Sequence, residues 1–541
     1  MNGTLMKKKS VLAIVLALTM AAGLLGGCGS TASTSTDSTA SSGSDTAASS
    51  SSDTSGGQDS YEVATVRWAD WGENYHEGFP DQAAKDTGIS IKWDTILNSD
   101  WADQKAVLMA GGDLPDAFMG SICFTESDIM TNLGSFIPLD DYIKDNMPNF
   151  SKILDSDPTM KALATSSDGH IYGLPAKKPC RPIIANQMFI NKTWLDNLGL
   201  SVPTTYDEYV KCLEVFRDQD ANGNGDPTDE IPYGGGYADP VMFYCLPFGT
   251  TIGADNTYDM TIKDGKPEYI PISDSYKAGI EAMHQAYADK LIDQEIFTQD
   301  DSMRDAKLMA ETPIVGSAAG WTADSTFGAN ASEYVALPAL KGPDGQQYIS
   351  SDPEHWNYSR YEFVVTTACK DPAKLLAWAD QFYTDDASIQ NFYGPFDTAV
   401  KKNDDGTYEI LEPNDGNSAD TFAWINSLRD FGPKYVEDGF NDKVKYDGEN
   451  GDASKLALDK DFQQYAKEAF PNVSYTSDQL NTLSTLYTDI SNYVDSMEAT
   501  WVTEGGASDQ WDGYIDQLNS MGLDKFLTIQ NDAYNTYEAS K

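Results

Sequence analysis

The chain has 541 residues and a formal net charge of −47 at pH 7, from 84 acidic and 37 basic side chains. Such an acidic surface repels nucleic acid and anionic lipid headgroups, which require clustered Lys or Arg, so we expect neither as a partner. The sequence contains no HExxH, GxSxG or Walker motif, which argues against the enzyme classes built on those motifs.

The first residues predict an export signal. Lys7 to Lys9 give a positive start, and residues 11–25 form an apolar stretch. A membrane-crossing helix needs roughly 20 apolar residues, so this stretch is too short for a permanent span and fits a removable signal peptide over residues 1–27. The sequence that ends in Cys28 (LGGC) resembles the bacterial lipobox. That resemblance implies that Cys28 carries the lipid (a palmitate-type acyl group) and anchors the chain to the outer face of the cell membrane. An ordinary signal peptide with a chance cysteine is the alternative.

The segment after Cys28 predicts a tether. Up to residue 60 it consists almost wholly of Ser, Thr, Ala, Gly and Asp, without aromatic or large aliphatic side chains, so residues 28–60 have nothing to bury and we expect them to be disordered. Residues 61–541 are too many for one compact core and predict two or more lobes. The other five cysteines are widely spaced and form no CxxC pair, which argues against a dense disulfide framework.

Short β-rich runs alternate with longer helical patterns from residue 61 onward, which is typical of parallel α/β architecture. We predict strands over residues 61–69, 89–96, 116–120, 189–190, 313–318 and 362–367. We predict helices after the capping box of Thr205 and Glu208, over Tyr276–Leu291, and from the Asp371-Pro372 pair onward. Residues 401–417 and 436–454 are irregular and polar, and we expect surface insertions there on one lobe.

Residues 218–232 (DQDANGNGDPTDEIP) predict a loop that binds structural calcium. Calcium prefers six to eight hard oxygen ligands, and alternate residues of a tight loop can point inward to supply them. With Asp220 as the first position, Gly225 falls where an EF-hand needs glycine, but Ile231 stands where the EF-hand has its bidentate Glu. The alternative is a solvated Asn-Gly turn. The predicted ligands are Asp220, Asn222, Asn224, Asp226 (through its backbone carbonyl), Asp229 and Glu230.

Longer strings around this loop resemble a known family. DGHIYGLP at Asp168–Pro175 and MFINKTWLDNLGLSVPTTYDEYV at Met188–Val210, together with the loop, are similar to family 1 of the extracellular solute-binding proteins. They look most like its long subgroup, which contains alginate-oligosaccharide-binding proteins and many lipoproteins. GGDLPDAFMG at Gly111–Gly120 and TPIVGSAAGW at Thr312–Trp321 follow in the family's order. The Asp-Glu pair comes one residue later here than in the alginate-binding loops, which leaves the roles of Asp226 and Asp229 open.

The resemblance implies an α/β fold of the two-lobed periplasmic-binding-protein type II, with a hinge and an interlobe cleft. The first lobe would take residues 61–183 and 356–398, and the second residues 184–355 and 399–541. The implied function is that of a monomeric, non-catalytic binding protein that captures an oligosaccharide and delivers it to the permease subunits of an ABC importer. A surface-anchored polysaccharide-degrading enzyme, a binding protein for a peptide-like solute and a surface adhesin or sensor stay open as alternatives.

Sugars offer apolar ring faces and a rim of hydroxyls, so we expect their site to combine aromatic side chains with polar ones. Four tryptophans lie at predicted strand ends, with polar residues beside them. Trp194 and Trp378 lie within helical stripes, and we expect them in the core. The predicted ligand-binding residues are Trp68, Asp70, Trp71, Glu73, Ser121, Trp321, Asp324, Trp356, Tyr358, Arg360 and Tyr393.

Overall fold

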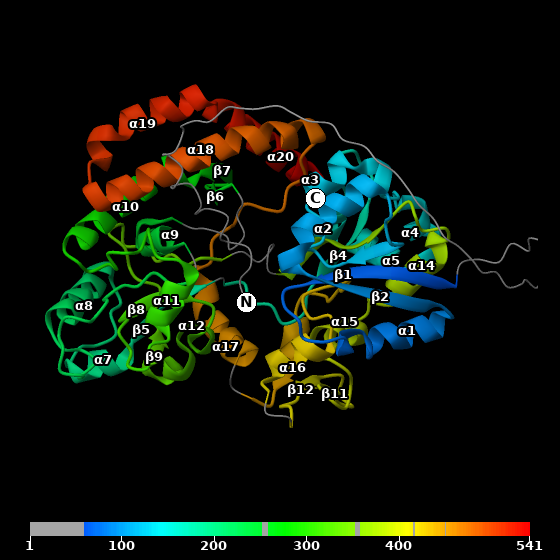
Figure 1. Ribbon diagram of the computed structural model, residues 1–541, viewed down its shortest axis with the longest axis horizontal. Coiled ribbons are helices and arrows are strands. Elements are labelled where there is room, and N and C mark those ends of the chain that lie inside the picture. The colour runs from blue at the N-terminus through cyan, green and yellow to red at the C-terminus, as the bar shows by residue number, and fades with distance from the viewer. Residues whose placement is uncertain are drawn as a thin grey trace, which may run out of the picture. The chain divides into compact units, whose positions relative to one another are not determined.

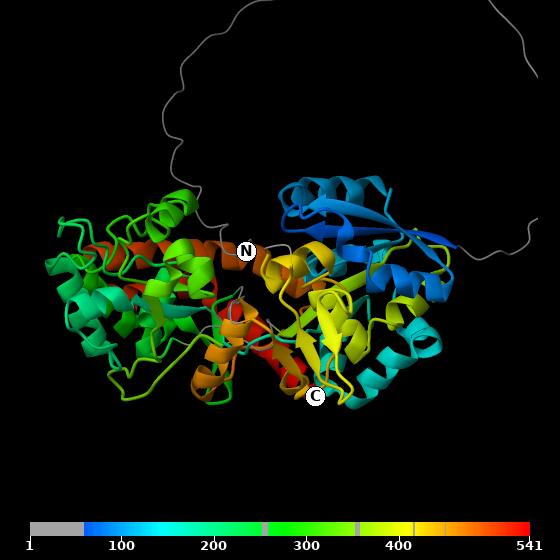
Figure 2. The ribbon, with the colours of Figure 1, turned by 90° about the horizontal axis from the view of Figure 1, so that it is seen from below.

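A computed structural model describes residues 59–184, 186–237, 239–250, 258–351, 357–414, 417–448 and 451–540. These residues form an α/β fold with a sheet in each of two lobes (Figures 1 and 2). The predicted signal peptide, Cys28 and nearly all of the predicted tether lie outside the described residues. Within the described ranges, no helix combines the length and the apolar character that crossing a membrane requires.

The first lobe is built on a five-stranded sheet with the strand order β2-β1-β3-β10-β4. Its strands are β1 (Ser60–Arg67), β2 (Ser90–Leu97), β3 (Ala117–Met119), β4 (Gly173–Lys177) and β10 (Tyr358–Val365). β1 pairs in parallel with β2 and β3, whereas β10 runs antiparallel to β3 and β4. β1 is buried almost continuously, as a strand covered on both faces should be.

Helices cover this sheet (Figure 1). They are α1 (Phe79–Thr87), α2 (Asn98–Gly111), α3 (Glu126–Thr131), α4 (Asp140–Asn146), α5 (Pro148–Ser156), α6 (Pro158–Ala164) and α14 (Pro372–Asp380). α15 (Asp385–Tyr393) follows α14 and packs in a separate cluster. Asp371 caps α14 by accepting a hydrogen bond from the Lys374 N–H, and Pro372 opens it, as predicted. Trp378 is fully buried and donates its indole N–H to the Pro80 carbonyl at 3.1 Å, which confirms its place in the core.

The second lobe has a three-stranded sheet, β8-β5-β9, whose pairs are all antiparallel, so the expectation of a parallel sheet is wrong there. Its strands are β5 (Gln187–Asn191), β8 (Ser317–Gly320) and β9 (Tyr334–Ala336), and β6 (Met260–Lys263) and β7 (Lys266–Tyr269) form a separate hairpin. Its helices are α7 (Lys192–Asn197), α8 (Tyr206–Asp218), α9 (Pro240–Cys245), α10 (Asp274–Ala288), α11 (Asp301–Leu308) and α12 (Ala323–Phe327). Thr205 caps α8 as predicted, and Trp194 is buried.

Residues 399–446 pack against the first lobe, so the predicted lobe boundary after residue 398 is too early. They contain β11 (Val400–Lys402), β12 (Tyr408–Ile410), α16 (Ala419–Asn426) and β13 (Val444–Tyr446). The three strands form a small sheet where we expected irregular insertions. Val400 and Ile410 share a hydrophobic cluster with Ile389 and Phe392 of α15, which explains why this segment stays with the first lobe.

The last described helices connect the two lobes on one side. α17 (Asp452–Phe462) is followed by α18 (Ser477–Glu504), α19 (Ala507–Met521) and α20 (Leu523–Ser540). Ser477 at the start of α18 donates to the Met130 carbonyl of α3 at 3.0 Å, whereas Glu498 near its end accepts from the Tyr276 hydroxyl of α10 at 2.8 Å. α18 therefore begins against the first lobe and ends against the second, as Figure 1 shows.

Candidate functional site

Aromatic side chains from two distant segments meet where β1 ends. Trp71 stacks on Trp424 of α16, with ring centroids 4.7 Å apart and planes 24° from parallel. Phe431 lies 6.4 Å from Trp68 and 6.0 Å from Trp424. Trp424 and Phe431 are buried, whereas Trp68 and Trp71 are partly exposed. Trp68 and Trp71, which the sequence predicted, can therefore offer ring surface to a ligand. Trp424 and Phe431, which we had not predicted, pack against them on the buried side.

Arg67 at the end of β1 contacts both Trp71 and the backbone beside Trp424, and so connects the two segments that form this aromatic group. Its guanidinium is buried, donates to the backbone carbonyls of Trp424 and of Ser427 (3.3 Å to the latter), and lies 5.6 Å from the Trp71 ring centroid. Burial lowers the pKa of Arg67 to about 10, which leaves it charged at neutral pH. The charge can therefore hold both the end of α16 and the indole of Trp71 in place.

Ser121, another predicted residue, lies beside the same group. Its N–H donates to the buried carboxylate of Glu362 at 3.1 Å, and the Gly432 N–H donates to the same oxygen at 2.9 Å. Phe431 packs directly on Gly120, where an added Cβ would come within 3.2 Å of the ring and where φ is +117°. Only glycine allows this approach without strain. The end of β3 and the segment after α16 are thus joined through Glu362.

Trp321, which follows β8 in the second lobe, lies against charged side chains. The Lys455 ammonium is 4.3 Å from its ring centroid, and the Arg181 guanidinium carbon is 5.9 Å away. Arg181 also forms an ion pair with Asp430, the residue before Phe431. Burial alone would raise the pKa of Asp430, but Arg181 and the other nearby cations hold it at about 2. Trp321 is therefore linked through one ion pair to the aromatic group of the first lobe.

The other predicted polar residues are more exposed. Asp70 accepts a hydrogen bond from the Gly72 N–H at 3.0 Å, and Glu73 accepts one from the Thr95 hydroxyl at 2.8 Å. Asp324 lies exposed in the first turn of α12. Tyr358 is partly buried, with the Lys177 ammonium 5.6 Å from its ring centroid. Trp356 lies outside the described residues.

Two predicted ligand residues are used inside the protein instead, which corrects the prediction for both. Arg360 has only 10% of its side chain exposed, forms an ion pair with Glu126 at 3.1 Å and donates to the Asn472 carbonyl at 2.9 Å. Tyr393 is 1% exposed, and its hydroxyl contacts Asp452 and Tyr446 at 2.7 and 2.8 Å. A buried ion pair or hydrogen-bonded hydroxyl leaves no group for a ligand to contact.

The predicted calcium loop is ordered by its own side chains. Asp220 accepts from the Gly225 N–H at 2.9 Å, and Glu230 accepts from the Ala221 N–H at 2.7 Å. The side-chain amides of Asn222 and Asn224 donate to the two carboxylate oxygens of Asp229, at 3.2 and 2.7 Å. The Asp226 carboxylate turns away and accepts from the Thr228 N–H and hydroxyl. Asp229 and Glu230 therefore hold the loop closed through hydrogen bonds to its first residues.

Two oxygens of this loop fit a cation. Oδ1 of Asp220 and Oε2 of Glu230 are buried and have no hydrogen-bond partner among the described residues. A buried carboxylate oxygen without a partner is costly, and a hard cation would satisfy both. In the described ranges no group of three or more His, Cys, Asp and Glu side chains could hold a metal ion, so calcium would also need amide or backbone oxygens. The loop supplies these through its asparagines.

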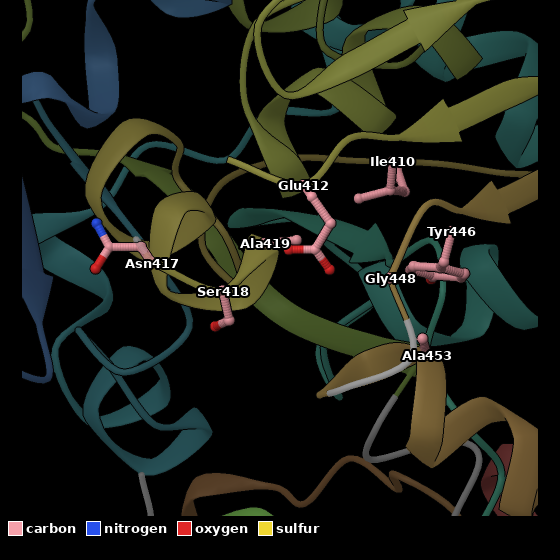
Figure 3. A pocket seen from close by; sticks show the side chains of 8 residues that line it. All are labelled: Ile410, Glu412, Asn417, Ser418, Ala419, Tyr446, Gly448 and Ala453. Carbon is pink, nitrogen blue, oxygen red and sulfur yellow. The ribbon is translucent and has the colours of Figure 1, made fainter. Parts of the chain in front are cut away.

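A surface cavity of about 240 Å³ lies elsewhere, between the small sheet and the first turns of α16 and α17. Figure 3 shows the Glu412 side chain extending into it between Ile410 and Ala419. The carboxylate lies against Gly448, where a Cβ would come within 1.6 Å of it. Its other lining residues are Asn417, Ser418, Tyr446 and Ala453. None of the predicted ligand residues lines this cavity, so it is separate from the aromatic group.

Comparisons with known proteins decide the family. The family model of the bacterial extracellular solute-binding proteins matches residues 67–389. The fructooligosaccharide ABC transporter substrate-binding protein FusA of Streptococcus pneumoniae is 31% identical over 483 residues, which are 84% of this chain and 86% of FusA. The chain belongs to the bacterial extracellular solute-binding protein family. The resemblance found in the sequence is thereby confirmed.

Solved structures confirm the predicted two-lobed α/β fold. FusA in complex with kestose has a TM-score of 0.73 at 29% identity, and a FusA EF-hand mutant in complex with fructo-nystose has 0.74 at 28%; both comparisons cover 89% of this chain and all of FusA. The HMO-binding solute-binding protein of Bifidobacterium longum infantis has a TM-score of 0.75 at 26% identity, covering 89% of this chain and 99% of that one. The alginate-binding protein AlgQ2 shares the fold, with a TM-score of 0.66 at 20% identity over 88% of this chain and 98% of AlgQ2.

Proposed function

We propose that this protein captures an oligosaccharide between its two lobes and delivers it to the permease subunits of an ABC importer. The observation that carries the proposal is the pair of aromatic surfaces: Trp68 and Trp71 at the strand ends of the first lobe, and Trp321 at a strand end of the second. Partly exposed indoles match the apolar faces of sugar rings. FusA, whose name describes a fructooligosaccharide-binding ABC transporter protein, supports the same function.

Capture would work by closure and without catalysis. An oligosaccharide that touches both lobes stabilises the closed state by the difference between its affinities for the closed and open states. The proposed hydroxyl partners are Asp70, Glu73 and Ser121 beside the aromatic group, Asp324 on α12, and Tyr358 on β10. The relatives that support capture without catalysis are binding proteins. The alternative hypothesis is a polysaccharide-degrading enzyme with the same fold. Incubation with glycans separates the two, because an enzyme releases new reducing ends or unsaturated products.

Calcium is the proposed structural ion of the loop from Asp220 to Glu230. The two buried carboxylate oxygens without partners support it, and so does the EF-hand in a relative that is 28% identical. The ion would hold the segment that follows α8 by neutralising carboxylates that otherwise repel one another. The proposed ligands are side-chain oxygens of Asp220, Asn222, Asn224, Asp229 and Glu230 and the backbone carbonyl of Asp226, since the Asp226 carboxylate bonds to Thr228.

The proposed location is the outer face of the cell membrane, where a lipid on Cys28 holds a monomeric binding protein through the tether of residues 28–60. The sequence around Cys28 supports this, and one relative is named a lipoprotein: LipO of Bacillus subtilis, 27% identical over 61% of this chain and 65% of its own length.

A glycan panel screened by thermal shift, with calcium present, tests the proposed function. Binding of an oligosaccharide raises Tm, because the ligand binds the folded state alone. A panel of peptides in the same plate tests the alternative ligand class. If peptides raise Tm and no glycan does, the protein is a peptide-binding protein.

A further inference from the structure

A small cavity lies where β5 begins in the second-lobe sheet. It has a volume of about 50 Å³ and is lined by Gln187 at the start of β5, by apolar side chains that include Phe243, Leu337 and Phe462, and by residues with polar side chains, among them Asn186 and Ser350. Gln187 pairs with Gly320, the residue before Trp321. Phe462 ends α17, the helix that carries Lys455 against the Trp321 ring. The cavity therefore opens within the same set of residues that positions Trp321.

The Gln187 side chain has an unsatisfied amide. It is 7% exposed, and neither its Nε2 nor its Oε1 has a hydrogen-bond partner among the described residues. Buried amides in folded proteins are almost always bonded, so an amide with both ends unpartnered requires an explanation. Because Gln187 lines the cavity, a group bound in the cavity can satisfy the amide.

The size and chemistry of the cavity define that group. A single water molecule needs on the order of 10–15 Å³ of such space, so the cavity holds a few waters or one substituent of similar size, and not a sugar ring. Its walls are mostly apolar, and the amide offers a donor and an acceptor side by side. A hydroxymethyl group fits, because its carbon contacts the walls while its hydroxyl both accepts from Nε2 and donates to Oε1.

We propose that Gln187 and this cavity form a selectivity subsite that takes a hydroxymethyl group from the sugar unit seated next to Trp321. This inference rests on the proposed function. A site built to bond a hydroxyl rejects ligands that lack it, because its buried polar group is then left unpaired. The subsite would therefore distinguish hexose units with a hydroxymethyl arm from pentose or deoxy units that lack one.

The test compares the full-length protein with Gln187→Met, which keeps the side-chain shape but cannot form these hydrogen bonds. Gln82→Met is the matched control, because Gln82 is exposed on α1 and its side chain donates a hydrogen bond to Asp86 on the surface. Calorimetry measures the affinity of each protein for kestose, or for the tightest-binding glycan of the panel where kestose does not bind. Melting without sugar measures stability.

We expect Gln187→Met to weaken sugar binding at least tenfold while its Tm without sugar is unchanged or higher, since the variant removes an unpartnered polar group. Gln82→Met should match the wild type. Wild-type affinity in Gln187→Met would overturn the inference, and so would a lowered Tm with unchanged affinity, which would mean that the amide bonds to structural water. If the wild type binds no glycan at all, the proposed function fails and the subsite fails with it, a result distinct from failure of the variant alone.

Discussion

The ammonium of Lys455 lies 4.3 Å from the ring centroid of Trp321, and the Lys455 side chain is completely buried. When Lys455 is charged, the attraction between the desolvated cation and the indole, roughly 2 kcal/mol, offsets part of the cost of burying the charge. α17 is therefore held against the end of β8, and the indole proposed to contact sugar is fixed by a residue 134 positions further along the chain.

This contact predicts a pH dependence of stability. Burial lowers the pKa of Lys455 to about 7, although Asp459 opposes the shift. The unfolded chain keeps an ordinary lysine with a pKa near ~10.4, so between about pH 7 and that value the unfolded state binds more protons. The contribution of Lys455 to the free energy of unfolding should therefore become more favourable as pH rises through this window. Below pH 7 the full cost of burying the charge is present.

Lys455→Met isolates this effect, because it removes the buried charge and keeps an apolar side chain of similar length. The variant should gain most in stability over the wild type at pH 7 and below, and the gain should shrink toward pH 10. Urea unfolding of both proteins at four pH values measures it. A difference that stays constant from pH 6 to pH 10 would contradict the lowered pKa.

The aromatic group predicts a graded series of binding defects. Trp71→Ala and Trp321→Ala should each weaken sugar binding at least tenfold, which is about 1.4 kcal/mol, because they remove exposed ring surface. Trp424→Phe should retain most of the affinity, since a smaller ring can still support Trp71. Sugar-dependent quenching of tryptophan fluorescence measures the series. The control is Trp378→Phe, a core change that should lower Tm and leave the affinity unchanged; the idea fails if that variant loses affinity while Trp71→Ala does not.

The calcium loop predicts that the ion stabilises the fold. Calcium at 100-fold excess over its dissociation constant should add about 2.7 kcal/mol to the free energy of unfolding, because it binds only the folded loop. Tm should therefore rise with calcium and fall with EDTA. An unchanged melting curve after exhaustive chelation would argue against the site.

Two matched variants locate the ligands of that ion. Asp220→Asn should lose most of the calcium response, since Oδ1 of Asp220 is buried without a partner. Asp226→Asn should keep it, because that carboxylate bonds to Thr228 and only the backbone carbonyl of Asp226 is a proposed ligand. Equal loss in both variants would mean that the Asp226 side chain also binds the ion.

The Arg360–Glu126 pair predicts a stability defect without a binding defect. Glu126→Gln leaves the Arg360 charge buried without its counter-ion, and breaking such a pair costs about 3–5 kcal/mol. Sugar affinity of the folded protein should not change, because the pair lies among internal contacts. Lys92→Met, which removes the exposed partner of Glu62, should change neither property. Weakened sugar binding at unchanged stability in Glu126→Gln would return Arg360 to the ligand site.

The proposed lipid anchor on Cys28 predicts where the protein is found in cells. Cys28→Ser should move it from the membrane fraction to the culture medium, since the tether has no other apolar segment to hold it. Immunoblots of the two fractions measure the shift. Equal membrane retention of the variant would show that another feature anchors the chain.

Local sequence signals predicted individual helices and strands. The pairing of distant strands and segments depends on long-range contacts, which the sequence pattern does not specify. Thr205 and Asp371 cap their helices as expected, because a cap bonds within its own first turn. β10 pairs with β4 at residues 181 to 191 positions away, and no local pattern specifies that partner. Residues 399–446 were assigned to the second lobe for the same reason, because their contacts with the first lobe are not specified by any local pattern.

The residues of the candidate site also differ in whether a local sequence pattern could indicate them. Trp68, Trp71 and Trp321 could be proposed from the sequence because strand ends can be recognised from local patterns. Trp424 was missed, since its role depends on a segment that the sequence assigned to the second lobe. Arg360 was misassigned because its partner Glu126 is 234 positions away. The sequence signal that could have indicated Trp424 is the group of aromatic residues within residues 422–431.

Titration calorimetry of the purified protein with oligosaccharides, followed by recovery of the sugar, tests the central claim most directly. The account predicts saturable binding of one oligosaccharide per protein, with the sugar recovered intact. Failure of every oligosaccharide to bind while a peptide binds, or recovery of cleaved sugar, would contradict it.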